Sequence, residues 1–235
     1  NLAAGYQTLT SNTTGASNSA IGFQALALNT TGSYNQAFGP AALFSNTTGG
    51  YNVAVGDSAL YANTTGSFNA ALGDRSLYAN TTGQYNTGLG MKALFSNTTG
   101  FYNTATGYTS LYSNTTGYQN TAVGRDALDA NTTGAHNTAI GRGALTENTT
   151  ANSNTAVGSL SLDANTTGAQ NTAVGYDSLG ANTTANNNTA VGYRALLANT
   201  TEEEAAGPGE QYEMPPFSLG GGLSLIHILR CRRIE

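Results

Sequence analysis

A seventeen-residue unit repeats through most of this chain without an insertion or a deletion. The window Asn120–His136 shows it as N-T-A-V-G-R-D-A-L-D-A-N-T-T-G-A-H. Its first asparagine returns every seventeen residues from Asn1 to Asn188, so twelve copies fill residues 1–204. A unit this short cannot enclose a core alone, but stacked copies can share one. The period therefore predicts a solenoid with one coil for each copy.

We number the positions of each copy from 1 to 17 and name a position in successive copies a column. Columns 5 and 9 are always Gly and Leu, columns 12–14 always read Asn-Thr-Thr, and column 3 is Ala except at Gly88. Column 15 is Gly except at Ala151, Ala185 and Glu202. A buried leucine contributes roughly 1.5–3 kcal/mol. The predicted core column is Leu9, Leu26, Leu43, Leu60, Leu77, Leu94, Leu111, Leu128, Leu145, Leu162, Leu179 and Leu196.

The residue types along one copy predict an all-β parallel β-solenoid, or β-roll. Columns 1–4 favour a short strand because Thr and Val are β-formers, and the glycine of column 5 ends it. Asn-Thr-Thr-Gly at columns 12–15 predicts a corner at which glycine supplies a positive φ. Columns 6–11 are either another short strand or about one helical turn, and the turn is favoured. Twelve coils at ~4.8 Å would give a rod about 58 Å long, with asparagine ladders in columns 1 and 12.

Column 4 varies in volume from Ala4 to Phe38, which a close-packed interior would tolerate poorly. Its neighbours in columns 3 and 5 stay small. Because strand side chains alternate, we expect columns 3 and 5 to face the interior and column 4 to form an outward apolar seam. Such a seam predicts lateral self-association of the rod.

The core N-T-A-V-G, at Asn120–Gly124, Asn154–Gly158, Asn171–Gly175 and Asn188–Gly192, resembles the head repeats of trimeric autotransporter adhesins. It is also similar to repeats of phage and virus-like tail fibres. The resemblance implies a left-handed parallel β-roll assembled as a parallel homotrimer, with an adhesive or spacer role outside the cell. This repeat differs from the adhesin type in being longer and in carrying the invariant Asn-Thr-Thr corner.

Aromatic side chains gather in two columns of the N-terminal half and are candidates for binding a sugar or a neighbouring subunit. The alternative is that they only shield the edge of the solenoid. Column 17 holds Tyr34, Tyr51, Phe68, Tyr85 and Tyr102, and column 10 holds Phe44, Tyr61, Tyr78, Phe95 and Tyr112.

The Asn-Thr-Thr triplet is also an N-glycosylation sequon. Glycans every ~4.8 Å would be crowded, which favours a structural role for the asparagine. The paired threonines suggest ice binding less well, because adjacent residues of a strand face opposite ways. The candidate glycosylation sites are Asn12, Asn29, Asn46, Asn63, Asn80, Asn97, Asn114, Asn131, Asn148, Asn165, Asn182 and Asn199.

Charge and composition predict neither an enzyme nor a nucleic-acid-binding protein. Only 9% of residues are charged, and both signs mix in columns 6 and 7, as at Arg125 and Asp126, without a basic stripe. The two histidines, His136 and His227, cannot form a repeated catalytic or metal cluster. We therefore expect no catalytic residue, metal or cofactor. We also expect no insertion into a membrane, because no apolar run is long enough to span one.

The repeat fails at Glu202, and residues 205–222 are rich in Gly and Pro, as in a linker or disordered end. Residues 223–235 are similar to the read-through of a sequencing adapter and are expected not to be native. The chain opens within a repeat, which suggests a metagenomic fragment of a longer exported protein. We predict a non-enzymatic extracellular rod of a surface adhesin or virion tail fibre, which self-associates as a homotrimer or fibril and has a glycan or protein receptor. Glycosylated fibrils, and carbohydrate- or ice-binding solenoids, are the alternatives.

Overall fold

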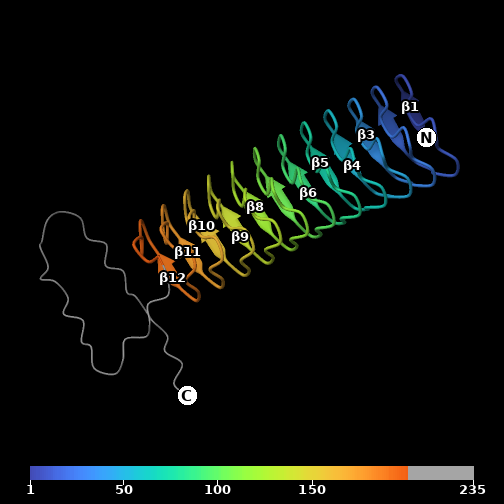
Figure 1. The fold of residues 1–235 in the computed structure, drawn as a ribbon. Coiled ribbons are helices and arrows are strands. Elements are labelled where there is room, and N and C mark those ends of the chain that lie inside the picture. Colours follow the sequence, from blue (N-terminus) through green and yellow to red (C-terminus); the bar gives the residue numbers. More distant parts are fainter. Residues whose placement is uncertain (201–235) are drawn as a thin grey trace, which may run out of the picture.

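The computed structural model describes residues 1–200, and these form a single parallel β-solenoid without a helix (Figure 1). Each copy contributes one three-residue strand, and the strands lie in chain order in one twelve-stranded parallel sheet. The predicted fold class is confirmed. The strands are β1 Leu2–Ala4, β2 Ser19–Ile21, β3 Gln36–Phe38, β4 Val53–Val55, β5 Ala70–Leu72, β6 Thr87–Leu89, β7 Thr104–Thr106, β8 Thr121–Val123, β9 Thr138–Ile140, β10 Thr155–Val157, β11 Thr172–Val174 and β12 Thr189–Val191.

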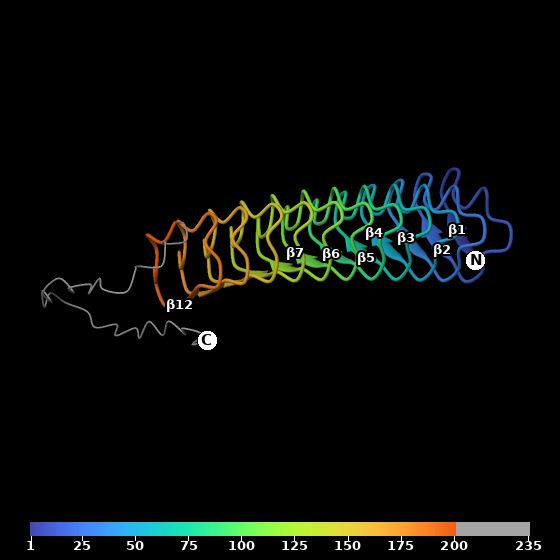
Figure 2. The same cartoon turned by 60° about the horizontal axis from the view of Figure 1, so that its bottom comes forward.

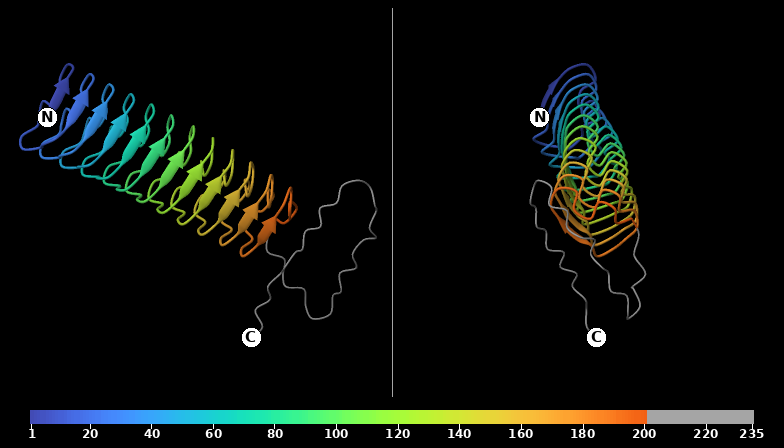
Figure 3. Two further views of the ribbon diagram at one scale, coloured as in Figure 1. Left: turned by 180° about the vertical axis from the view of Figure 1, so that it is seen from behind. Right: turned by 90° about the vertical axis from the view of Figure 1, so that its left-hand side faces the viewer.

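Every strand pairs with the equivalent columns of the next copy, as where Ala122 lies beside Ala139. The strands run along one side of the rod, and the coils nest as flattened loops along its length (Figures 2 and 3). The end of the solenoid at Glu202 and the two tail segments, 205–222 and 223–235, lie outside the described residues. The repeat period thus fixes the register of the whole sheet.

Columns 6–11 form irregular turns, so the favoured helical turn was wrong. Column 7 has φ of 51–58° wherever it is not glycine, and the column 9 leucines have φ of 49–54°. An α-helix needs negative φ throughout. Here the N–H groups instead bond to neighbouring coils: Lys92 N–H donates to the carbonyl of Asp74 (2.9 Å) and Leu94 N–H to that of Ser110 (3.0 Å). Bonds between coils therefore hold leucine in a conformation that it rarely adopts.

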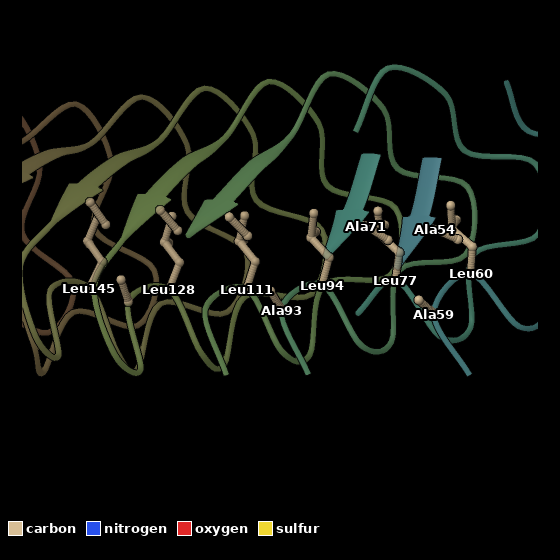
Figure 4. Close-up of a cluster of buried hydrophobic side chains, with 14 of the residues drawn as sticks. Ala54, Ala59, Leu60, Ala71, Leu77, Ala93, Leu94, Leu111, Leu128 and Leu145 are labelled. Carbon is tan, nitrogen blue, oxygen red and sulfur yellow. The ribbon is translucent and has the colours of Figure 1, made fainter. Parts of the chain in front are cut away.

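The core is narrow and consists of the column 9 leucines packed against the column 3 and column 8 alanines. Leu26 through Leu179 are fully buried at every copy, as are nearly all alanines of columns 3 and 8. Figure 4 shows the leucines in a row, their side chains directed toward the strands that carry Ala54 and Ala71. The predicted leucine column is buried from Leu26 to Leu179, and its end members Leu9 and Leu196 are half-buried.

Two buried asparagine columns brace the Asn-Thr-Thr corner. The column 12 amide of Asn63 donates to Asn46 Oδ1 in the preceding coil (2.8 Å) and to the carbonyl of Gly66 (3.0 Å). The column 1 amide of Asn52 donates to the same carbonyl (2.9 Å). No buried side-chain polar atom of the described residues lacks a partner. Both predicted ladders are present and satisfy their own hydrogen-bonding groups.

The glycine of column 15 does not have the positive φ that we predicted. Glycine is needed here because the neighbouring atoms leave no room for a side chain: a Cβ on Gly66 would collide with Asn63 Oδ1 and the carbonyl oxygen of Gly83. Positive φ belongs instead to column 5, where the glycines have φ of 131–139°, and to column 17, at 54–60°. The prediction that the column 15 glycine supplies the positive φ of the corner was therefore wrong.

Candidate interaction surfaces

The outward face of the sheet carries columns 2 and 4. Column 3 is buried, whereas Leu72 is 50% exposed, Ile140 41% and Val191 53%. Every member of column 4 is exposed or half-exposed. The direction predicted for column 4 is confirmed, and the lateral association through it stays a prediction.

Column 2 shares this face and was missed as a surface in the sequence. It is threonine in seven successive strands: Thr87, Thr104, Thr121, Thr138, Thr155, Thr172 and Thr189. Columns 2 and 4 contain no charged residue in any of the twelve strands. The alternation around the small residue of column 3 was the signal that could have revealed it. The sheet therefore presents a regular, uncharged array of hydroxyl and branched aliphatic groups.

Column 6 forms the corner that follows each strand and is exposed in ten of the twelve copies. Tyr6 is 68% exposed and Tyr193 72%. Both signs of charge mix here, as the sequence showed for columns 6 and 7, and four of the twelve residues of column 6 are charged. The full column is Tyr6, Phe23, Pro40, Asp57, Asp74, Met91, Tyr108, Arg125, Arg142, Ser159, Tyr176 and Tyr193. Column 6 borders the apolar seam that we predicted at column 4, and from here on the seam denotes columns 4 and 6 together.

The predicted aromatic residues form two continuous stacks. In column 17 the ring centroids from Tyr34 to Tyr102 are 4.8–5.0 Å apart. In column 10 those from Phe44 to Tyr112 are 5.1–5.2 Å apart, with planes within 8° of parallel. Parallel rings in contact contribute roughly 0.5–1.5 kcal/mol for each pair beyond the area they bury. Both stacks therefore reinforce the coil spacing.

The stacking also limits what these rings can bind. Both faces of an inner ring such as Phe68 lie against other rings, so its edge is what remains for solvent. Phe101 lies outside these two stacks: its ring meets that of Tyr102 edge-on, at 71°, and stacks on that of Tyr118. A shallow hollow beside it is lined by Thr82, Gln84, Tyr85, Thr99, Phe101 and Tyr102. This hollow is where a ring face could meet a ligand.

The sequon asparagines are poor glycan acceptors in the folded coil. Asn29 through Asn182 of column 12 are fully buried, so their amides do not reach the surface. Asn131 Nδ2 donates to Asn114 Oδ1 (2.8 Å) and to the carbonyl of Gly134 (3.1 Å). A glycan on this nitrogen would replace one of these donors and could not fit in the core. The structural role of the asparagine is supported over glycosylation.

The two adjacent threonines of the corner have different surroundings, as expected. The Oγ1 hydroxyl of Thr132, in column 13, donates a hydrogen bond to the carbonyl of Thr149 (3.0 Å) in the next coil. Thr133 of column 14 is exposed. Column 13 therefore serves the stacking, and column 14 alone does not form the flat array of alternate threonines that ice binding needs.

The charged groups make local ion pairs between an exposed arginine and a half-buried aspartate, such as Arg125 with Asp126 (3.2 Å) and Arg194 with Asp177 (3.1 Å). Burial raises the pKa of Asp129, and the charges of Asp126 and Glu147 raise it further. Burial likewise raises the pKa of Asp163, with a contribution from Asp177. These carboxylates are separated along the rod and do not converge on one pocket.

Within residues 1–200 no group of three or more His, Cys, Asp or Glu side chains is placed to hold a metal ion. That part of the chain also has no helix long and apolar enough to cross a membrane. No protein-family model, curated protein or solved structure matches this chain.

Proposed function

We propose that this chain is the rod segment of an extracellular fibre, such as a surface adhesin or tail fibre, and that its rods associate sideways. The observation that carries the proposal is the uncharged outward face of the sheet, which runs unbroken through all twelve strands. Exposed apolar faces of this extent on soluble proteins mark interaction sites. The extracellular setting rests on the resemblance of the N-T-A-V-G core to adhesin and tail-fibre repeats.

The hydrogen bonding of the coils supports a spacer role. The carbonyl of Thr98 accepts the N–H groups of Thr81 (2.9 Å), Thr82 (3.2 Å) and Gly83 (3.3 Å), as well as the Oγ1 of Thr81 (3.0 Å). The same arrangement recurs at most corners. Because each coil is bonded to both neighbours at the strand, the turn and the corner, bending requires many bonds to lengthen together. Such a rod holds its two ends at a fixed separation.

Column 4 of this outward face is also part of the seam, and the seam is the surface through which we propose that the rods associate, as a homotrimer or as a fibril. The hollow beside Phe101 is the site we propose for a glycan or protein receptor. A fibril decorated with sugars on its Asn-Thr-Thr triplets is disfavoured, because the asparagines from Asn29 to Asn182 are buried and donate both amide hydrogens, as Asn131 does.

The test is the mass of the assembled particle in solution, measured by sedimentation for the wild-type chain and two variants. Leu72→Glu with Ile140→Glu places charge on exposed members of the seam, and we expect it to yield monomers. Thr65→Glu with Thr133→Glu places the same charge on the exposed column 14 and is the matched control. The proposal fails if the wild-type chain is a monomer at about 100 µM, or if both variants dissociate equally.

One observation supports a second candidate, ice binding, on a surface other than the paired threonines. A column 2 threonine and a column 4 valine share the outward face of β8, β10, β11 and β12, as Thr155 and Val157 do, and these columns pair in register between neighbouring strands. Regular hydroxyl and methyl groups can order water on a surface without charge. Thermal hysteresis of the wild-type chain, abolished by Thr155→Lys, would support this function, and its absence in the wild type would exclude it.

A further inference from the structure

The charges of the seam are ordered along the rod. Copy 1 begins at Asn1 and copy 12 at Asn188. In column 6 the acids Asp57 and Asp74 belong to copies 4 and 5, and the bases Arg125 and Arg142 belong to copies 8 and 9. Asp57 and both arginines are exposed, and the Asp74 side chain is 42% exposed. Within residues 1–200, Asp57 and Arg142 form no ion pair.

This order is self-complementary when one rod is reversed. If copy 4 faces copy 9 of a second rod, copy 5 faces copy 8. Asp57 then lies opposite the partner's Arg142, and Asp74 opposite the partner's Arg125. In column 7 the same alignment sets Arg75 opposite the partner's Asp126. By symmetry each of these pairs occurs twice.

The apolar members of the seam fit the same alignment. Phe23 in copy 2 lies opposite the partner's Tyr176, and Met91 in copy 6 opposite the partner's Tyr108. Column 4 is uncharged throughout and sets aliphatic groups against each other, as with Leu72 and the partner's Val123. A charged residue of column 6 therefore never faces an apolar one.

We propose that the seam binds a second copy of this chain running antiparallel, with a two-fold axis between copies 6 and 7. The proposal rests on the proposed sideways association and names its partner and orientation. A two-fold interface is isologous, so that residue i meets j and j meets i, as these columns do. The parallel trimer implied by the adhesin resemblance would be replaced by an antiparallel pair.

Other alignments lose this complementarity. In a parallel, in-register assembly Asp57 faces Asp57 and Arg142 faces Arg142, and like charges across an interface disfavour it. A slip by one coil in the antiparallel arrangement leaves Asp57 opposite Arg125 but sets Asp74 against Tyr108. Charge therefore selects both the orientation and the register.

The seam runs the length of the rod. Twelve strands at ~4.8 Å span about 53 Å, and the antiparallel register places every coil of one rod opposite a coil of the other.

A charge-reversal series tests the orientation. Asp57→Arg with Asp74→Arg sets arginine against arginine in the antiparallel dimer, and we expect its dissociation constant to rise at least about tenfold. Adding Arg125→Asp and Arg142→Asp exchanges the two signs and should restore the wild-type constant. In an in-register parallel assembly the double variant only replaces one like-charged contact by another. Equal association of the double variant and the wild type would overturn the proposal.

Cysteine cross-linking gives an independent readout, in a full-length Cys231→Ser background. Asp57→Cys together with Arg142→Cys should form intermolecular disulfides under mild oxidation, and neither single variant should do so efficiently. Cross-linking of the Asp57→Cys single variant to itself would show a parallel pair and overturn the antiparallel orientation while leaving sideways association intact. A wild-type chain that is monomeric in sedimentation would instead remove the association on which both proposals depend.

Discussion

The side-chain amide of Asn120 donates a hydrogen bond to the carbonyl oxygen of Gly134 (2.8 Å), fourteen residues further along the same coil. Asn131 donates to that carbonyl as well (3.1 Å). Two asparagine columns therefore converge on one backbone oxygen and close each coil from both sides. Both columns are asparagine in every copy because each side chain must offer two donors and an acceptor. Glutamine is the other uncharged side chain with these groups, and it is larger.

Replacing Asn131 by Ala should destabilise the coils around it by about 2–4 kcal/mol. The substitution removes two donors and leaves the buried amide of Asn148 without the acceptor that it uses at 2.9 Å. Hydrogen exchange of the backbone amides in copies 7–9 measures the effect locally, since a repeat array need not unfold in one step. Thr133→Ala, at an exposed position of the same corner, should change the result by less than about 0.5 kcal/mol. Equal protection in the two variants would contradict the role of the ladder.

Replacing Tyr78 by Ala should cost about 2–3 kcal/mol, because its ring stacks between those of Tyr61 and Phe95 at 5.2 Å on either side. Tyr78→Leu keeps much of the apolar contact and should cost less. Thermal unfolding of the two variants separates the stacking contribution from burial. A loss of binding to a glycan surface in the triple Ala variant of Tyr61, Tyr78 and Tyr85, with the coil spacing intact, would show instead that the rings serve recognition.

The sequence predicted the features that depend on one residue type repeated at one spacing. The leucine spine, the inward alanines and the outward column 4 all follow from volume and alternation, as the contrast of Ala122 with Val123 illustrates. The conformation of columns 6–11 could not be predicted, because Leu128 has a φ of 53° that its own propensity opposes. Only the bonds to neighbouring coils impose it, and these appear once the coils are stacked. The order of aromatic and charged residues in column 6 can be read in the sequence, where we noted only that both signs of charge mix.

Acidification should stabilise the C-terminal half of the rod. The pKa of Asp129 is raised in the folded chain, first by burial and then by the charges of Asp126 and Glu147. A carboxyl with a raised folded pKa binds its proton more tightly in the folded state, so the free energy of unfolding increases as pH falls from neutrality through that pKa, and levels off below the unfolded value.

Asp129→Asn should accordingly stabilise the chain at pH 7, by less than about 1 kcal/mol because the group is partly exposed. It should also flatten the pH dependence, and Asp163→Asn should act in the same direction. Urea unfolding between pH 4 and pH 7 is the measurement. Thr65→Glu, which adds an exposed charge away from the seam, controls for net charge. A pH dependence that remains in both Asp129→Asn and Asp163→Asn would show that other carboxylates control it.

Two glycines of copy 9, Gly141 and Gly143, should respond in opposite ways to alanine. Gly141 has a φ of 139°, and its added Cβ would collide with the carbonyl of Gly158 and lie 2.9 Å from the N of Ser159. Both contacts are with backbone atoms, which cannot move away as a side chain can. We therefore expect Gly141→Ala to lower the free energy of unfolding by more than about 3 kcal/mol.

Gly143 lies in column 7, where Ala41 already adopts a φ of 53°. The nearest atoms to its added Cβ are Leu160 Cδ2 at 3.0 Å and Thr146 Oγ1 at 3.3 Å, both on side chains that can move. The cost of a positive φ is roughly offset by the lower entropy of the unfolded chain, so Gly143→Ala should change stability by less than about 1 kcal/mol. Chemical unfolding and hydrogen exchange of copies 8–10 compare the two variants. If Gly141→Ala were as stable as Gly143→Ala, the close approach of successive coils at column 5 could not be what keeps that column glycine.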